Sequence, residues 1–274
     1  MKKFLTLLII TSFLVLPVYA AKDRTTEEYL KGSYHPFAMS FLGENIVNTA
    51  IKHALKKEAP GRYKVKFKGY TLSSIKKGIF KYLEITGKNV DADGIEIPYF
   101  NIKTVTDYHY IDYNQTPVAF KSDMEFDCIV HLSEKSINDA LEKDDYNKIL
   151  RNINKKAFPM FTIIKVNVKL KNNKMYIIMS YNFPLAPREK DRTFMVSSRL
   201  HIVNNEIKPY DISFDTAYGN LPLNKVVNLV NMLNPLNFTA KLIDSKDGEY
   251  KIKEIKIEDD IVIINGKIFV KGDK

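Results

Sequence analysis

The side chains that could support catalysis are few and lie far apart in the chain. Five histidines occur among 274 residues, and His131 follows Asp127 by four positions in a stretch with strand character. Residues four apart in a strand lie on one face, so the carboxylate could orient the imidazole. Asp107 and His109 form a similar pair. Because neither pair has an identifiable nucleophile, we interpret both histidines as structural.

Motifs for metals and nucleotides are equally scarce. The chain contains no GxSxG, HExxH, CxxC or Walker A sequence. Residues 91–94, Asp-Ala-Asp-Gly, resemble the start of a calcium loop, but the third acidic ligand and the closing glutamate are missing. We therefore predict a tight turn there, with Gly94 at positive φ. No catalytic residue, metal site or cofactor is expected, and the protein is not expected to be an enzyme.

The first residues predict export from the cytoplasm. Lys2 and Lys3 precede an apolar run over 4–16, and Val18-Tyr19-Ala20 fits a signal peptidase site. The run is shorter than the ~20 residues of a membrane-spanning helix, which favours cleavage over an uncleaved anchor. The expected location is the periplasm or another extracytoplasmic space. The predicted divisions are a signal peptide over 1–20, a flexible lead-in over 21–37 and a single domain over 38–274.

Composition narrows the possible partners. The only cysteine, Cys128, can form no internal disulfide, so we expect a buried free thiol. Loss of Lys2 and Lys3 lowers the formal charge from +10 to +8, carried by scattered lysines. In the cytosol such a charge would suggest nucleic acid. Export favours an anionic membrane surface instead, near which each lysine contributes on the order of 1 kcal/mol.

An amphipathic helix is predicted over 41–57, ahead of a mostly β chain. Its apolar residues recur at helical spacing, and Pro60-Gly61 ends it. The middle of the apolar face is a shallow stripe that a sheet or a long thin ligand could approach closely. This stripe consists of Gly43, Val47, Ala50 and Ala54.

Most of the remaining chain alternates apolar and polar residues, as strands do. Asparagine pairs at 172–173 and 204–205 suit two-residue hairpins, because Asn tolerates positive φ. A change of phase between Ile252 and Ile255 predicts a bulge near 253–254. Strands are expected over 63–68, 79–86, 95–111, 118–132, 164–170, 175–183, 194–203, 207–214, 238–243, 250–257 and 261–270.

Three more helices are predicted. Ser133 is the expected N-cap of the first, and the second covers 145–157. The third covers 223–233, includes Val227 and Val230 on its apolar face, and mirrors the helix at 41–57. The strand at 175–179 is apolar on both faces, which predicts either a second covering layer or a lipid-lined groove.

The order of these elements resembles a known family. The stretches that carry the likeness are 78–105 (GIFKYLEITGKNVDADGIEIPYFNIKTV), the Leu-Ser-x-x-x-Ile-Asn-x-x-Leu pattern at 132–141, and 229–270. They resemble the LmeA-like family of bacterial phospholipid-binding proteins, formerly a domain of unknown function and similar to the tubular lipid-binding (TULIP) superfamily. The likeness spans nearly all of the mature chain.

This resemblance implies an α+β fold in which a long curved antiparallel sheet wraps around two amphipathic helices. It also implies an exported, non-catalytic phospholipid-binding or lipid-transfer protein in cell-envelope lipid homeostasis, with phospholipid and anionic membrane as partners and no nucleic acid. Each buried methylene contributes about 0.8 kcal/mol, so a lipid needs a covered path through water. The alternative is a structural or interaction module of the envelope whose core is filled by its own side chains.

The residues expected to contact lipid come from both helices and from the two-faced strand. Each of them could also be ordinary core, and the lysines expected at headgroups or membrane could be a solvated face. The expected lipid-binding residues are Gly43, Val47, Ala50, Ala54, Met175, Ile177, Met179, Val227 and Val230, and the expected headgroup or membrane contacts are Lys64, Lys66 and Lys68.

Overall fold

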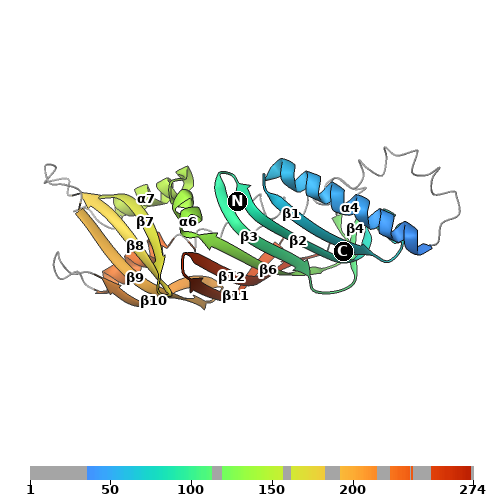
Figure 1. Cartoon of the computed structure of the whole chain (residues 1–274). Coiled ribbons are helices and arrows are strands. Elements are labelled where there is room, and N and C mark those ends of the chain that lie inside the picture. The colour runs from blue at the N-terminus through green and yellow to red at the C-terminus, as the bar shows by residue number, and fades with distance from the viewer. Residues whose placement is uncertain are drawn as a thin grey trace.

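The computed structural model describes residues 36–112, 119–156, 162–182, 192–214, 223–234, 236 and 248–272. This part of the chain is a β-rich α+β fold with antiparallel strands, as expected. It is elongated, with α4 and β1 to β4 towards one end and β7 to β10 at the other (Figure 1). The predicted signal peptide, most of the lead-in and the strand at 238–243 lie outside the described residues.

The described helices begin with the predicted amphipathic one, which is longer than expected at both ends. None of them is long and apolar enough to cross a membrane. The helices are α4 (Pro36–Glu58), α5 (Leu72–Lys76), α6 (Glu134–Leu141), α7 (Asp144–Lys156) and α8 (Leu223–Leu233). The strands are β1 (Arg62–Gly69), β2 (Ile79–Ala92), β3 (Ile95–Thr104), β4 (His109–Asp112), β5 (Ala119–Phe120), β6 (Met124–Ser133), β7 (Thr162–Lys171), β8 (Lys174–Asn182), β9 (Arg192–Val203), β10 (Glu206–Phe214), β11 (Gly248–Glu258) and β12 (Ile261–Val270).

The strands form two sheets, whereas one long sheet was expected. In the larger sheet the long strands follow the order β1-β2-β3-β6-β12-β11, and the short β4 and β5 extend from β2. The smaller sheet has the order β10-β9-β8-β7. Its strands pair in sequence because short hairpins join β7 to β8 and β9 to β10, while α6 and α7 separate β7 from β6.

Turn chemistry predicted the hairpins correctly. Both asparagine pairs, 172–173 and 204–205, have positive φ, as do Asp93 and Gly94 in the turn between β2 and β3. The register of β11 against β12 shifts between Ile252 and Glu254, which confirms the predicted bulge. Ser133 caps α6 in a reciprocal pair with Ser136. Local residue types were sufficient for these features because each depends on a few neighbouring residues.

Two predicted strands are each divided in two in the structure, and β2 continues to Ala92, past its predicted end at Thr86. The segment 95–111 divides into β3 and β4, and the segment 118–132 divides into β5 and β6. Exposed residues at 105–108 interrupt the first segment, after which β4 pairs with the start of β2. The buried ring of His109 then packs on Phe80, with 4.9 Å between the ring centroids. Packing against β2 therefore bends the chain away from a single strand.

Side chains of α4 cover the free edge of β1. Asn48 Oδ1 accepts a hydrogen bond from the backbone N–H of Phe67 at 2.8 Å, and Glu44 Oε1 accepts one from Gly69 at 3.0 Å. An uncovered edge strand would offer these groups to another chain. α4 therefore closes this edge of the larger sheet as well as burying its own apolar face.

Asparagine side chains cover two more edges. Asn138 on α6 bonds both the N–H and the carbonyl of Val168 in β7, at 2.8 and 2.9 Å. Asn205, in the β9–β10 turn, accepts from the N–H of Ile252 and donates to the carbonyl of Tyr250, both at 2.6 Å. A side-chain amide has one donor face and one acceptor face, so it replaces a missing neighbouring strand. Asn205 also ties the smaller sheet to β11 of the larger one.

Candidate functional site

One face of the larger sheet is apolar across all six long strands. We call it the apolar face. The strand register places its side chains in rows that cross the sheet over about 24 Å, at about 4.8 Å per strand. The central row is Val65, Ile85, Ile102, Cys128, Gly266 and Ile252. A neighbouring row is Tyr63, Gly87, Phe100, Val130, Ile264 and Ile255.

The opposite face of the same sheet is polar. There Glu84 accepts hydrogen bonds from Lys66 at 2.5 Å, Asn101 at 3.0 Å and Tyr82 at 3.2 Å. The hydrogen bond from the Lys66 ammonium is the main reason why the pKa of Glu84 is lowered. The sheet therefore separates a face that carries these charged and polar groups from the apolar face.

The described helices cover only part of the apolar face. α4 packs along β1, α6 contacts β3, β6 and β7, and α8 packs on β10. None of the described helices contacts β12 or β11 extensively. The apolar side chains of these two strands are nevertheless buried and belong to one hydrophobic cluster with the rest of the sheet. A ligand could contact this region only if the cluster opened.

Tyr250 places a hydroxyl group on this part of the apolar face. Its ring lies over Gly266, where an added Cβ would be 2.8 Å from the ring and equally close to the carbonyl of Lys251. The hydroxyl is buried and has no hydrogen-bond partner among the residues that the structure describes. Burial raises the pKa of Tyr250 well above its ordinary value. An unpaired buried hydroxyl costs about 1–3 kcal/mol, so it calls for an explanation.

Cys128 lies at the centre of the apolar face, close enough to Tyr250 for the two groups to interact electrostatically. It is the buried free thiol that was expected. Burial raises the pKa of Cys128 to about 12, so the thiol stays protonated at neutral pH. Sequence reasoning missed Tyr250 as a site residue. The signal that could have found it is Gly266, because a glycine inside a strand often marks a close approach of another group. Tyr250 lies two positions before Ile252, which is the strand partner of Gly266.

The predicted lipid-binding residues of α4 are covered by protein. Val47, Ala50 and Ala54 are 3%, 1% and 4% exposed, on the helix face that packs along β1. An added Cβ at Gly43 would lie 2.9 Å from Leu72 Cδ1 of α5. Lipid contact at this stripe stays a prediction, and it would require α4 to move away from β1.

The other predicted lipid-binding residues belong to the smaller sheet and its helix. Met175, Ile177 and Met179 point to one side of β8 and are buried. On α8, Val230 is buried and Val227 is half-buried, and the helix packs on β10. The structure thus places the α4 residues with the larger sheet and the β8 and α8 residues with the smaller one. α4 and α8 make no extensive contact in the described part of the chain.

The three predicted headgroup lysines lie on the outward side of β1. Lys64, Lys66 and Lys68 are exposed, but the charge of Lys66 is balanced by Glu84 at 2.5 Å. Among the described residues, Lys64 and Lys68 form no ion pair. Of the three, Lys68 lies nearest the end of the sheet where β4 begins.

The two Asp–His pairs do not form catalytic arrangements in the described part of the chain. His131 stacks on Tyr99, with 4.8 Å between centroids, and Asp127 pairs with Lys103 at 3.9 Å. His109 Nε2 lies 2.8 Å from the carbonyl oxygen of Thr106. No group of three His, Cys, Asp or Glu side chains within the described ranges could hold a metal ion.

The buried His109 should make the stability of the folded protein depend on pH. Burial lowers the pKa of His109 in the folded chain, whereas an unfolded histidine titrates at about 6.5. As pH falls below about 6.5, the unfolded chain takes up a proton that the folded chain refuses, so stability falls. We expect His109→Gln to reduce the loss of unfolding free energy between about pH 7.5 and about pH 5.5, measured by urea titration.

The matched control for this prediction is His53→Gln on the exposed side of α4. It should leave the pH dependence as it is in the unchanged protein. Equal pH dependence in all three proteins would show that His109 accepts a proton as readily in the folded chain as in the unfolded one.

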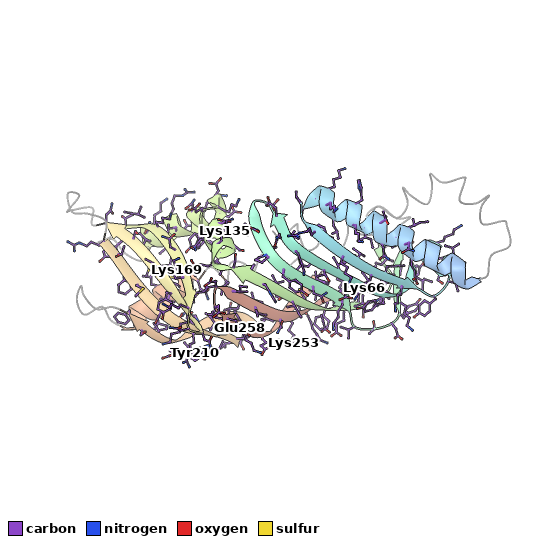
Figure 2. All side chains as sticks on the ribbon, in the orientation of Figure 1. Lys66, Lys135, Lys169, Tyr210, Lys253 and Glu258 are labelled. Carbon is purple, nitrogen blue, oxygen red and sulfur yellow. The ribbon has the colours of Figure 1, made fainter. Side chains whose placement is uncertain are left out.

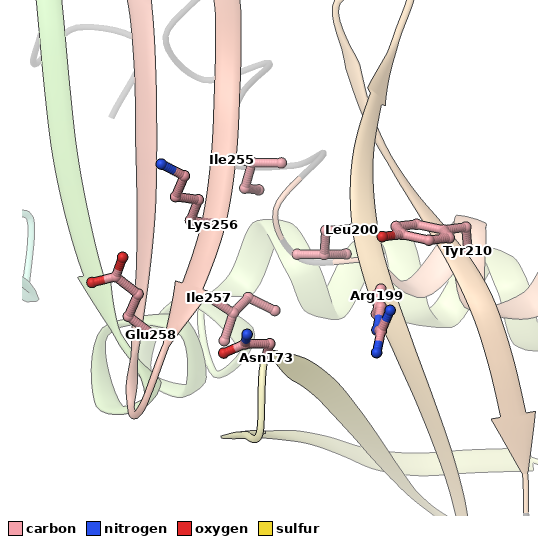
Figure 3. A pocket seen from close by; sticks show the side chains of 8 residues that line it. All are labelled: Asn173, Arg199, Leu200, Tyr210, Ile255, Lys256, Ile257 and Glu258. Carbon is pink, nitrogen blue, oxygen red and sulfur yellow. The ribbon is translucent and has the colours of Figure 1, made fainter.

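A shallow cleft of about 420 Å³ lies where the smaller sheet meets β11 (Figure 3). Both of its basic side chains already have acidic partners, since Arg199 lies 3.5 Å from Asp211 and Lys256 lies 2.9 Å from Glu254. Figure 3 shows Lys256 and Glu258 directed away from Leu200. This geometry suits a junction between sheets better than a ligand site. The lining residues are Asn173, Arg199, Leu200, Tyr210, Ile255, Lys256, Ile257 and Glu258.

The apolar face is therefore the best candidate site, because it combines a large apolar area with an unpaired hydroxyl. Comparison of the chain with known protein families, characterised proteins and solved structures gives no match.

Proposed function

We propose that this chain is an exported phospholipid-binding or lipid-transfer protein of the cell envelope, without catalytic activity. The resemblance to the LmeA-like family suggested this function, and the apolar face is the observation that supports it best. Acyl chains would lie against β12 and β11, where no described helix packs extensively. In this proposal the larger sheet curves around its ligand in the manner of the TULIP superfamily.

Lipid binding at this face would replace contacts among apolar side chains with contacts between those side chains and acyl chains. Side chains that now pack on one another would pack on acyl chains, so little hydrophobic free energy is lost when the cluster opens. The hydroxyl of Tyr250 gains a partner in the process, because a lipid ester carbonyl accepts hydrogen bonds. An acyl lipid thus fits both the apolar area and the hydroxyl of Tyr250, which lacks a partner among the described residues.

A structural module of the envelope is the second candidate function. It is favoured by the burial of the predicted lining residues, including Ala50 on α4 and Ile177 on β8. Native mass spectrometry of protein purified without detergent separates the two functions. Bound phospholipid, or uptake of a fluorescent phospholipid by stripped protein, would support the carrier. A stable protein that carries no lipid and takes up none would overturn it.

Tyr250→Phe tests the place of the lipid within the protein. We expect it to weaken phospholipid retention about fivefold, the equivalent of one hydrogen bond worth about 1 kcal/mol. The folded protein itself should not lose stability, because the hydroxyl has no partner to lose. Lipid release to acceptor vesicles and thermal unfolding measure the two effects.

Tyr63→Phe is the matched control. Tyr63 also lies on the apolar face, but its hydroxyl donates to the carbonyl of Ala59 at 2.7 Å. This variant should lose about 1 kcal/mol of stability and retain lipid normally. If the two variants lost lipid equally, Tyr250 would have no special role.

A further inference from the structure

One end of the larger sheet exposes aromatic and apolar side chains. We call it the tip. Tyr70, Val105 and Tyr108 are 46%, 44% and 53% exposed. They belong together because the Tyr70 hydroxyl donates to the carbonyl of Asp107, between the other two. Large exposed apolar side chains gathered at one place indicate an interaction surface.

Lysines surround these side chains at the tip. Gly69 pairs with Phe80 and Ile111 donates to the carbonyl of Gly78, so the ends of β1, α5, β2 and β4 meet here. The backbone N–H of Lys121 donates to Tyr110, and Gly272 donates to Asp123, which adds the start of β6 and the end of β12. The exposed lysines of these segments are Lys68, Lys76, Lys77, Lys81, Lys121 and Lys271.

None of these six lysines forms an ion pair in the described part of the chain. Three carboxylates near these lysines have other ion-pair or hydrogen-bond partners. Glu125 pairs with Lys267, Glu44 accepts the N–H of Gly69, and Asp123 accepts the N–H of Gly272. Many lysines elsewhere do have acidic partners, such as Lys66 and Lys169 (Figure 2). The six lysines therefore carry positive charge that no ion pair among the described residues balances, and this charge can attract an external anion.

We propose that the tip docks on an anionic bilayer surface. Tyrosine rings suit the interface between headgroups and acyl chains, because one end of the side chain is apolar and the other is polar. Lysines add an attraction to anionic headgroups, and the combination of two signals is what stable peripheral binding requires. α4 begins at this same end of the molecule (Figure 1), and its Glu44 lies beside Gly69. The inference rests on the proposed lipid function for its purpose, since a carrier must meet a membrane.

Vesicle flotation tests the docking. The unchanged protein should float with phosphatidylcholine vesicles that contain phosphatidylglycerol, and not with phosphatidylcholine alone. Lys76→Glu combined with Lys77→Glu should lower the affinity at least tenfold, and Tyr108→Ser should lower it severalfold. Both changes concern exposed side chains, so thermal unfolding should stay the same.

Lys251→Glu combined with Lys253→Glu is the matched control. Both lysines are exposed on β11, and Figure 2 shows Lys253 away from the tip. This variant should float like the unchanged protein. Equal losses in the two double variants, no loss in either, or no flotation of the unchanged protein would each overturn the docking surface.

A measurement of bound lipid distinguishes failure of the docking surface from failure of the proposed carrier function. Native mass spectrometry should find the same bound phospholipid in the tip variants as in the unchanged protein, because the apolar face is intact. A protein that floats through its tip but carries no lipid would leave the docking surface standing and overturn the carrier.

Discussion

Cys128 should react with N-ethylmaleimide at least a hundredfold more slowly in the folded protein than in denaturant. Burial raises the pKa of Cys128 to about 12, against about 8.5 for a free cysteine. At about pH 8 the reactive thiolate is then over a thousandfold scarcer, and the higher nucleophilicity of a basic thiolate recovers only part of that factor. Mass spectrometry of the adduct over time gives both rates. A folded rate near the denatured one would show that Cys128 is exposed.

The same reaction reports on lipid binding. Cys128 is the only cysteine of the chain and lies at the centre of the apolar face. If the hydrophobic cluster opens to admit acyl chains, protein stripped of lipid should react faster than protein loaded with lipid. Identical rates, with lipid still bound, would place the lipid elsewhere, for example at α4 or β8. In denaturant the two preparations should react alike.

Features set by neighbouring residues were predictable from the sequence. Asn172, Asn173, Asn204 and Asn205 all adopt the positive φ that two-residue hairpins need. The α4 helix and the bulge beside Lys253 also follow from local periodicity. Each of these depends on residues within a few positions of one another, so tertiary packing had little opportunity to change them.

Features set by distant contacts were not predictable in the same way. Periodicity identifies a strand but not its partner, so the division into two sheets required the structure. The apolar stripe of α4 was equally compatible with a ligand or with β1. Asn48 bonds the edge of β1, and helical periodicity alone does not reveal such a partner. Tyr250 was noticed only as part of a strand, because its missing hydrogen bond is a property of the folded surroundings.

The covered edges connect the fold to the proposed function. A protein that must open a hydrophobic cluster exposes apolar strands for part of the time, and free strand edges then favour aggregation. Asn48, Asn138 and Asn205 cover β1, β7 and β11 with side chains, so these edges are satisfied without further strands. The covering groups are small and local. Each can therefore be tested by a single substitution.

Asn138→Ala should destabilise the protein by about 2–4 kcal/mol, because it leaves a buried N–H and a buried carbonyl unpaired. Both groups belong to Val168 on the free edge of β7, and Val168 is fully buried. Urea unfolding followed by circular dichroism measures the change. Asn154 still bonds the N–H and the carbonyl of Ile163 on the same edge, and Glu134 still accepts from the N–H of Leu170, so the loss should be confined to Val168.

Asn152→Ala is the matched control, since it removes the same side chain from an exposed position on the neighbouring helix α7. Its stability should stay within about 0.5 kcal/mol of the unchanged protein. If Asn138→Ala behaved like this control, water would be replacing the amide at Val168, and the side chain would not be what closes the edge of β7. A large loss confined to Asn138 would instead show that one amide stands in for a missing strand.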